Sequence, residues 1–340
     1  MDLIRLDKNE NPYGPSPYVY EEISRAIHKI SSYPTYYGDD LIPKLSAHYN
    51  LMDDNILVGN GLDEIISLIC QTFLTSTDTA ISTLFTFPGY QNGVKNSKAK
   101  LILMPLLNYR ISIDIFRETL AKNINTKIVF VCNPHNPTGT FLPKNELMEI
   151  ITLCLQRKCI CVIDEAYAEF FEEPLNSAVQ QVLNYENLLI LRTFSKAYGL
   201  AGLRIGYVLG QNKLIKIIEK FRKVIPFSVN VLAQLASISA LNDQPYLTKI
   251  IDYNKKFRHF FYTLCDRKKI FYVPSITNFV LIKAPYASLY EDLLNRNIRV
   301  CNTESVGLLN HLRITIGNSE DMKKLENIFS ELVGKDKANV

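Results

Sequence analysis

The stretch LLILRTFSKAYGLAGLRIGYVL, residues 188–209, contains two apolar runs, Leu188–Leu191 and Ile205–Leu209. Short apolar runs of this kind predict buried β-strands. The segment between them, Thr193–Gly206, is the densest cluster of polar residues and glycines in the chain. Because ligands of open α/β sheets bind beyond the carboxyl ends of the strands, this segment is a candidate site.

Similar apolar runs precede this stretch and alternate with amphipathic, helix-like segments such as Asp63–Phe73 and Lys144–Gln156. Strands that lack polar alternation and are separated by helices are typical of a mostly parallel sheet with an α/β fold. We therefore expect a large α/β domain over residues 36–240. Its further predicted strands are Ile56–Val58, Thr79–Ser82, Lys100–Met104, Lys127–Cys132 and Cys159–Ile163.

The two ends of the chain follow other patterns. Residues 1–35 carry the turn formers of Asn9–Pro17 before an amphipathic run, Tyr20–Ile30, and predict an extended arm followed by a short helix. Residues 241–340 predict a small α+β domain. Its expected strands are Ile270–Val273, Phe279–Lys283 and His311–Ile316, and its expected helices are Ser288–Asn295 and Ser319–Leu332, after a helical pattern over residues 230–266.

The composition is that of an ordinary globular protein, with 47% hydrophobic and 21% charged residues in a chain of 340. The net charge of +4 includes no long basic run, which argues against nucleic acid as the main partner. The seven cysteines form no Cys-x-x-Cys pair and the five histidines show no metal-ligand spacing, so neither a disulfide framework nor a metal site is expected. A charged N-terminus and the lack of a long apolar run favour a cytoplasmic protein without a membrane span.

Three polar segments follow predicted strands and carry the candidate chemistry. The first is Asn133–Gly139, NPHNPTG, whose prolines and glycine would hold Asn136 at the sheet edge. The second begins with Asp164, a carboxylate in apolar surroundings. The third contains Lys196, whose amine can attack a carbonyl only if burial or nearby cations lower its pKa.

The third segment also contains Thr193, Ser195 and Arg204, which are the residue types that bind a phosphate. One lysine beside a phosphate site is what pyridoxal phosphate requires, because its aldehyde joins a lysine and its phosphate needs an anchor. Asp164 suits the carboxylate that keeps the pyridine nitrogen protonated. The residues therefore predict a pyridoxal-phosphate enzyme, but they leave its reaction open.

Motifs spaced over nearly the whole chain resemble those of fold-type I aminotransferases, and within that group those of histidinol-phosphate aminotransferases. The resemblance implies an aspartate-aminotransferase-like large domain, a small C-terminal domain and a homodimer. The motifs that carry it are Asn9–Pro12, Tyr33–Pro34, Gly59–Glu64, Asn133–Gly139, Asp164–Phe170, Ser195–Gly206 and His311–Gly317.

The resemblance also implies a role for individual residues. Lys196 would bind the cofactor and move the substrate α-proton, Asp164 would pair with the pyridine nitrogen, and Tyr90 would stack on the ring. Asn136 and Tyr167 would hydrogen-bond the ring hydroxyl. The phosphate would be held by Thr193, Ser195, Arg204, the backbone of Gly61, Leu62 and Asp63, and Tyr33 of a second subunit. The substrate would be bound by Arg313, Asn11 and Arg299.

The implied reaction is a ping-pong transfer of an amino group from a phosphorylated donor, such as histidinol phosphate, to 2-oxoglutarate in histidine biosynthesis. Three positions depart from the family pattern, namely Leu62, Ser228 and Cys301. Cys301 stands where the family usually carries an arginine that binds the substrate phosphate, and Arg299 lies two residues earlier. Either the strand is shifted in register by two residues, so that Arg299 takes the place of that arginine on the same face of the strand, or the arginine that would bind the substrate phosphate is missing.

The run Ile298–Cys301, Ile-Arg-Val-Cys, also resembles threonine-phosphate decarboxylases, so decarboxylation is the main alternative reaction. A specialised enzyme acting on another amino acid is a further alternative. A non-catalytic scaffold is disfavoured, because the chain keeps Lys196, Asp164, Asn136 and Arg204 together.

Overall fold

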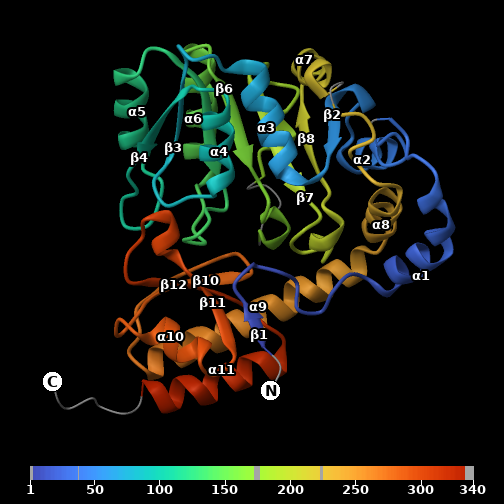
Figure 1. Ribbon diagram of the computed structural model, residues 1–340. Coiled ribbons are helices and arrows are strands. Elements are labelled where there is room, and N and C mark those ends of the chain that lie inside the picture. Colours follow the sequence, from blue (N-terminus) through green and yellow to red (C-terminus); the bar gives the residue numbers. More distant parts are fainter. Residues whose placement is uncertain (1–2, 37, 172–176, 223–224, 334–340) are drawn as a thin grey trace.

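The computed structural model describes residues 3–36, 38–171, 177–222 and 225–333. Figure 1 shows a large sheet with helices on both faces, and below it a smaller sheet packed against helices. The N-terminal segment runs between these two parts and contributes to both. Among the described residues, no helix is both long enough and apolar enough to cross a membrane.

The large sheet has seven strands in the order β2-β8-β7-β6-β5-β3-β4. Neighbouring strands from β7 to β4 are parallel, whereas β8 is antiparallel to both β7 and β2. The mostly parallel sheet predicted from the sequence is thus confirmed, and each predicted strand is present. The strands are β2 (Ile56–Gly59), β3 (Thr79–Thr83), β4 (Lys100–Met104), β5 (Thr126–Cys132), β6 (Ile160–Asp164), β7 (Leu188–Thr193) and β8 (Gly206–Gly210).

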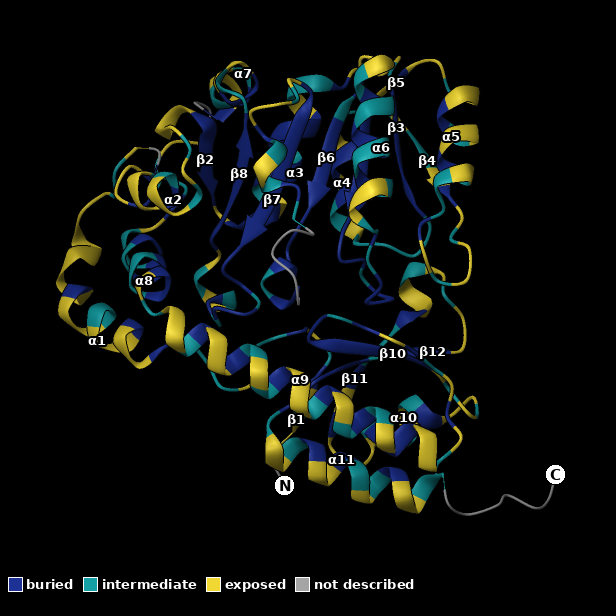
Figure 2. Ribbon diagram, turned by 180° about the vertical axis from the view of Figure 1, so that it is seen from behind, coloured by how far each residue is buried: buried dark blue, intermediate teal, exposed yellow. Residues whose placement is uncertain are grey.

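Helices cover both faces of this sheet, with α3 and α4 on one face and α6 on the other (Figures 1 and 2). The strands β7 and β8 are buried along their whole length, and β6 is buried except at Ile160, because both faces are covered. The helix α3 begins at Gly61, two residues before its predicted start, and α6 has its predicted bounds. The helices are α2 (Ile42–Tyr49), α3 (Gly61–Phe73), α4 (Pro88–Asn96), α5 (Ile113–Lys122), α6 (Lys144–Gln156) and α7 (Asn212–Arg222).

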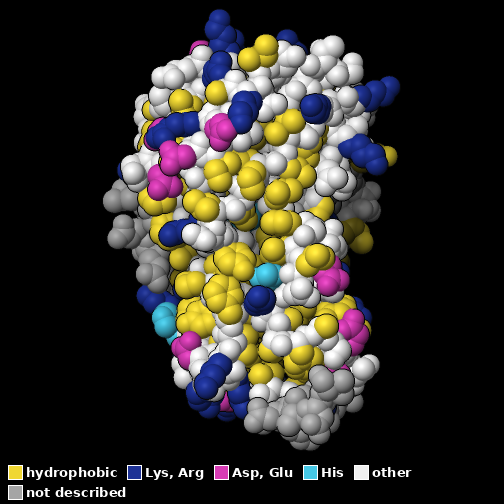
Figure 3. Space-filling view, turned by 90° about the vertical axis from the view of Figure 1, so that its left-hand side faces the viewer, with side chains coloured by type: hydrophobic (Ala, Val, Ile, Leu, Met, Phe, Trp, Pro, Cys, Tyr) yellow, Lys and Arg dark blue, Asp and Glu magenta, His cyan; other side chains and the backbone are white. Residues whose placement is uncertain are grey.

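One side of the molecule carries β4, the edge strand of the large sheet. Figure 3 shows hydrophobic side chains gathered along this side, with lysines and arginines scattered around them. Leu103 of β4 contributes to the exposed apolar surface, with 41% of its area accessible.

The small sheet has five strands in the order β1-β11-β12-β10-β9. The strands are β1 (Ile4–Leu6), β9 (Tyr272–Val273), β10 (Phe279–Lys283), β11 (Ile298–Asn302) and β12 (His311–Thr315). In the described C-terminal part of the chain, the helices are α8 (Val231–Asn242), α9 (Gln244–Arg267), α10 (Leu289–Leu294) and α11 (Ser319–Leu332). Short 3-10 helices are η1 (Ile27–Ser31), η2 (Asp53–Asn55), η3 (Ala168–Phe170), η5 (Val179–Gln181), η6 (Ala201–Leu203) and η7 (Thr303–Val306).

The N-terminal segment contains the short helix expected over residues 1–35, and its extended arm includes a strand that the sequence did not predict. Its strand β1 pairs in parallel with β11, with Leu6 opposite Val300. Its helix α1 (Pro17–Ala26) lies beside α8. A strand of three residues is too short to show a period-2 pattern, and its partner lies almost the whole chain away.

Buried apolar side chains form two clusters, one around the large sheet and one around the small sheet. Leu6 belongs to the small-domain cluster and Val19 to the large-domain cluster, so the N-terminal segment joins the two. The long helix α9 also contributes to both, through Leu247 to the first and Phe261 to the second. A boundary near residue 240 therefore remains our proposal, with α9 connecting the two domains.

Candidate active site

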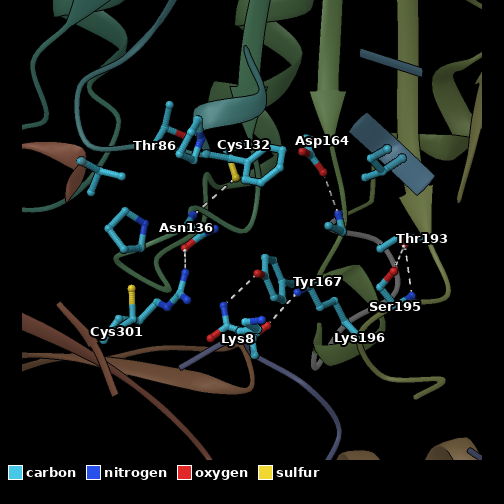
Figure 4. A pocket seen from close by; sticks show the side chains of 18 of the residues that line it. Lys8, Thr86, Cys132, Asn136, Asp164, Tyr167, Thr193, Ser195, Lys196 and Cys301 are labelled. Atoms are coloured by element: carbon cyan, nitrogen blue, oxygen red, sulfur yellow. Dashed lines mark hydrogen bonds between the residues drawn. The ribbon is translucent and has the colours of Figure 1, made fainter. Parts of the chain in front are cut away.

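A cavity of about 390 Å³ lies between the two domains, and the predicted catalytic residues line it. On the large-domain side, Asp164 ends β6 and Thr193 ends β7, as expected for a site at the carboxyl edge of a parallel sheet. On the small-domain side, Cys301 of β11 and Arg313 of β12 face the same space. Figure 4 shows Asp164, Thr193 and Ser195 across the cavity from Cys301.

Lys196 lies in this cavity, on the loop that follows β7. Its Nζ donates a hydrogen bond to the carbonyl oxygen of Lys8 at 3.1 Å and lies 5.6 Å from the centroid of the Tyr167 ring. Burial, followed by the charge of Arg313, lowers the pKa of Lys196 to about 8. With that pKa about a tenth of the amine is uncharged at pH 7, so it can act as a nucleophile and as a base.

Asp164 is a buried carboxylate that faces the cavity. Its Oδ2 accepts a hydrogen bond from the Tyr90 hydroxyl at 2.5 Å, and its Oδ1 accepts one from the Ala166 N–H at 3.0 Å. Burial raises the pKa of Asp164 to about 6, although both hydrogen bonds and the charge of Lys196 oppose that shift. A cation or a protonated ring nitrogen in the cavity would stabilise the ionised form.

Glu165, the next residue, points away from the cavity. Its side chain is fully buried and forms an ion pair with Arg192 at 2.9 Å, and Arg192 also pairs with Glu169 at 3.1 Å. Glu165 further accepts a hydrogen bond from the Ala178 N–H at 2.6 Å. These contacts hold the loop after β6, from which Tyr167 projects into the cavity.

Tyr90 lies beneath the cavity and does not line it, so the expectation that its ring faces a cofactor is corrected. The ring is completely buried and stacks on Phe130 at a centroid distance of 4.9 Å. Because α4 begins at Pro88, Tyr90 lies in its first turn and faces the sheet, where its hydroxyl contacts Asp164. The aromatic ring of this segment that lines the cavity is Phe87.

The expected phosphate-binding residues come together at the N-terminus of α3. Thr193 Oγ1 accepts a hydrogen bond from the Ser195 N–H at 3.1 Å, and Arg204 pairs with Asp63 at 2.9 Å. The structure therefore brings two hydroxyls and a guanidinium to the free N–H groups of a helix start, which is a favourable arrangement for a phosphate.

Gly61 keeps open the space between these phosphate-binding residues, which we call the phosphate cradle (Thr193, Ser195, Arg204 and the backbone of Gly61, Leu62 and Asp63). Its φ is +77°, a conformation that side-chain-bearing residues rarely adopt. A Cβ atom at this position would lie 2.6 Å from a terminal nitrogen of Arg204. Leu62, the next residue, lines the cavity and packs with only 9% of its surface exposed.

Arg313 connects the two sides of the cavity. One terminal nitrogen donates to Asn136 Oδ1 at 2.7 Å, and the other donates to the Asp7 carbonyl at 2.5 Å. Its guanidinium also lies 5.4 Å from the centroid of the Phe279 ring. A planar guanidinium held in this way can bind a carboxylate or a phosphate through two parallel hydrogen bonds.

Two of the expected substrate-binding residues do not line the cavity. Asn11 donates to the carbonyl of Ala197 at 2.9 Å, and so fixes the backbone beside Lys196. Arg299 lines an adjoining hollow, which shares Asp7, Cys301 and Ser305 with the main cavity. In the pairing of β11 with β12, Cys301 lies opposite Arg313, and Arg299 precedes this pair by two residues. Both alternatives for the altered position stay predictions.

Tyr33 lies outside the cavity of its own chain. Its side chain is 85% exposed, and its ring packs at 5.0 Å from that of Phe227. An exposed ring at this place is available to a second subunit, and its role there remains a proposal.

Several lining residues that the sequence did not indicate come from the N-terminal segment. Asp7, Lys8 and Asn9 reach the cavity because β1 pairs with β11, a contact that no local pattern reveals. The motif Asn9–Pro12 indicated that this segment belongs to the site, but the residue expected from it was Asn11, whereas Asn9 lines the cavity. Other lining residues that were missed are Thr86, Phe87, Cys132, Thr303, Ser305 and Val306.

Comparison with known proteins agrees with this geometry. Residues 1–329 match the family model for aminotransferase class I and II. Histidinol-phosphate aminotransferase of Bacillus subtilis (strain 168) is 35% identical over 337 residues, which cover 97% of this chain and 92% of the relative.

Solved structures share the fold. The Sinorhizobium meliloti histidinol-phosphate aminotransferase, solved in complex with pyridoxal-5'-phosphate, matches with a TM-score of 0.90 and 25% identity over 98% of this chain and 91% of that one. Aspartate aminotransferase from Thermus thermophilus, at 20% identity, has the same fold with a TM-score of 0.86 over 97% of this chain and 92% of that one. The protein therefore has the aspartate-aminotransferase-like fold and belongs to the class I and II aminotransferases.

Proposed function

We propose that this chain is a pyridoxal-phosphate-dependent histidinol-phosphate aminotransferase with 2-oxoglutarate as the amino acceptor. One observation carries the proposal: the Lys196 amine lies in a cavity shared with a buried carboxylate, Asp164, and with the phosphate cradle around Arg204. The relatives that match over nearly the full chain, and that bear this name, support the choice of substrate.

The residues present fit pyridoxal phosphate. The cradle at the start of α3 would hold its phosphate through Thr193, Ser195, Arg204 and the backbone of Gly61, Leu62 and Asp63. Asp164 would pair with the ring nitrogen, and its raised pKa of about 6 still leaves it mostly ionised at pH 7. When bound, the cofactor supplies an electron sink for the bonds of the substrate α-carbon.

The side chains of this chain then have distinct tasks. Lys196 would hold the cofactor and would move the proton of the substrate α-carbon, because its amine has a lowered pKa and lies in a partly closed cavity. Asn136 and Tyr167 orient the ring hydroxyl. Arg313 binds the anionic group attached to the α-carbon, which is the carboxylate of 2-oxoglutarate or the phosphate-bearing arm of histidinol phosphate.

We further propose a homodimer in which Tyr33 of each subunit reaches the phosphate cradle of the other. The exposed ring of Tyr33 and the neighbouring apolar side chains of Ile30 and Phe227 support this arrangement. Light scattering should then give twice the chain mass, and Tyr33→Ala should weaken cofactor binding. A monomer with full cofactor affinity would contradict the dimer.

Decarboxylation of a phosphorylated amino acid such as threonine phosphate is the second candidate. The observation that favours it is the position of Cys301, which places a thiol opposite Arg313 in the cavity wall, with Arg299 in the adjoining hollow. We propose Arg299 as a residue that contacts the distal anionic group of a donor extending past Cys301.

A product assay distinguishes the two reactions. The cofactor-loaded enzyme is incubated with histidinol phosphate and 2-oxoglutarate, and glutamate is measured; a parallel sample with threonine phosphate is tested for carbon dioxide. We expect glutamate and no carbon dioxide. Lys196→Ala should abolish both the product and the absorbance band that borohydride removes. Carbon dioxide without glutamate would replace the proposal with the decarboxylase.

A further inference from the structure

We propose that Asn9 is a positioning residue that makes the Tyr167 hydroxyl a hydrogen-bond donor toward the cavity. The inference rests on the proposed function, in which Tyr167 contacts the ring hydroxyl of the cofactor. It adds a residue from the N-terminal segment whose side chain acts through Tyr167.

Asn9 lies at the junction of the two domains and the N-terminal segment. It is 1% exposed, and its backbone has a φ of +54°. Its backbone N–H donates to Thr315 Oγ1 at 3.0 Å, and its carbonyl accepts from Asn278 Nδ2 at 3.0 Å. Its side chain contacts Thr315 Oγ1 through Oδ1 at 3.1 Å and Tyr167 Oη through Nδ2 at 2.9 Å.

The hydroxyl of Thr315 determines which way the amide faces. Thr315 Oγ1 accepts from the Asn9 N–H, and its single proton is donated to Asn9 Oδ1. The amide oxygen is therefore directed to Thr315, and the NH2 group is directed to Tyr167. With the opposite orientation, the Thr315 proton would have no acceptor among the described residues, which is costly in a buried site.

The direction of this chain of hydrogen bonds leaves Tyr167 with one unused proton. Its oxygen accepts from Asn9, and among the described residues no acceptor takes the Tyr167 hydroxyl proton. Tyr167 is buried and lines the cavity, so that proton is available to an oxyanion bound there. The ring oxygen of pyridoxal phosphate is such an acceptor.

A donor at that oxygen has a measurable consequence. The ring oxyanion also attracts the proton on the nitrogen that joins Lys196 to the cofactor. When Tyr167 donates to the oxyanion, it competes with that nitrogen and favours loss of the nitrogen's proton. The visible absorbance of the loaded enzyme should therefore titrate at a lower pH when Asn9 and Tyr167 are both present.

The test is a pH titration of the visible absorbance of the cofactor-loaded enzyme, without substrate, for Asn9→Asp and Tyr167→Phe. An aspartate tolerates the positive φ at this position, and its carboxylate accepts the Tyr167 proton and so reverses the hydrogen bond. We expect both variants to raise the titration midpoint, by about one pH unit for the loss of one such donor. The double variant should show no further rise.

Two other variants separate positioning from a general structural role. Thr315→Val frees the Asn9 amide to turn, and should raise the midpoint by less than Asn9→Asp does. Asn278→Ala removes a bond to the backbone of Asn9 alone, so we expect lower thermal stability with an unchanged midpoint. Circular dichroism verifies that each variant is folded.

Each outcome bears on the inference. A wild-type midpoint in Asn9→Asp, beside a raised one in Tyr167→Phe, would overturn it, as would an equal rise in Asn278→Ala. If no visible band forms with pyridoxal phosphate, the proposed function fails together with the inference. Because the titration uses no substrate, a wrong choice of amino donor leaves this test intact.

Discussion

The two walls of the active-site cavity are built in different ways. On the large-domain wall, Asp164 ends β6, and Thr193, Ser195 and Lys196 occupy the end of β7 and the loop after it. The small-domain wall combines the N-terminal segment with β11 and β12. A parallel sheet brings the ends of its strands to one edge, so the first wall follows from local order along the chain. The second depends on pairing between segments almost 300 residues apart.

The comparison also separates two tasks. The large-domain wall carries the amine, the carboxylate and the phosphate cradle, which any substrate of a pyridoxal-phosphate enzyme needs. The small-domain wall carries Arg313 and Cys301, which we propose contact the variable part of the substrate site, and the segment around Asn9, which we propose acts on Tyr167 of the first wall. We therefore expect changes in the first wall to abolish the chemistry and changes in the second to alter substrate preference.

The largest effect should come from Lys196→Ala. We expect turnover to fall by at least about 10⁴-fold, since one side chain supplies both the covalent link and the proton transfer. Steady-state kinetics with every donor tested should show the same loss. Lys213→Ala, which changes an exposed lysine of α7, is the matched control and should keep wild-type turnover. If the loss of turnover in the Lys196 variant differed between amino donors, it would contradict the assignment of the general chemistry to the large-domain wall.

Asp164→Asn should reduce turnover by about 10³-fold, because an amide cannot hold the ring nitrogen protonated as a carboxylate does.

The same change should stabilise the protein without its cofactor. Burial raises the pKa of Asp164 from 3.8 to about 6, so ionisation of the folded state is penalised. The folded state binds the extra proton between these values, and stability is lost as the pH rises through that range.

At pH 8 the full penalty is present, and it amounts to at most about 3 kcal/mol for a shift of this size. Urea unfolding at pH 4 and pH 8 measures it. We expect the asparagine variant to be the more stable protein at pH 8 and to depend less on pH over this interval. An asparagine variant less stable than wild type at pH 8 would show that the carboxylate is not destabilised by burial.

Arg313→Ala tests the small-domain wall. We expect kcat/KM for 2-oxoglutarate to fall by about 10²-fold through a raised KM, since a two-point hydrogen bond to a carboxylate is lost. Arg313→Lys should recover little of it, because an ammonium group cannot form the paired contact. Absorbance of the bound cofactor should remain normal in both variants, and loss of that absorbance would assign Arg313 to the cofactor instead.

Arg299→Ala should have the smallest effect. We expect a KM for histidinol phosphate about three- to fivefold higher, with the KM for 2-oxoglutarate unchanged, because an exposed arginine contributes at most about 1 kcal/mol to an ionic contact. Parallel kinetics with the two substrates measure the difference. An unchanged KM for the phosphorylated donor would show that this donor does not contact Arg299 and binds within the main cavity, beside Cys301.

Most of the fold could be predicted from the sequence. Each strand of the large sheet is a buried apolar run between helices, and this pattern is visible in residues such as Leu188–Leu191 without knowledge of the partners. Asp164 and Lys196 were found for the same reason, since Asp164 stands directly after such a run and Lys196 lies in the polar segment that follows another. The three-residue strand β1 was missed because its stability comes from β11 and not from its own pattern.

The sequence by itself determined the α/β domain, the positions of Lys196 and Asp164, and the cofactor that they suit, because these depend on local order along parallel strands. The tertiary structure decided that Phe87 and not Tyr90 lines the cavity, that Cys301 and not Arg299 lies opposite Arg313, and that Asn9 contacts Tyr167. These outcomes depend on helix rotation, strand register and long-range pairing, which are fixed by packing between distant segments.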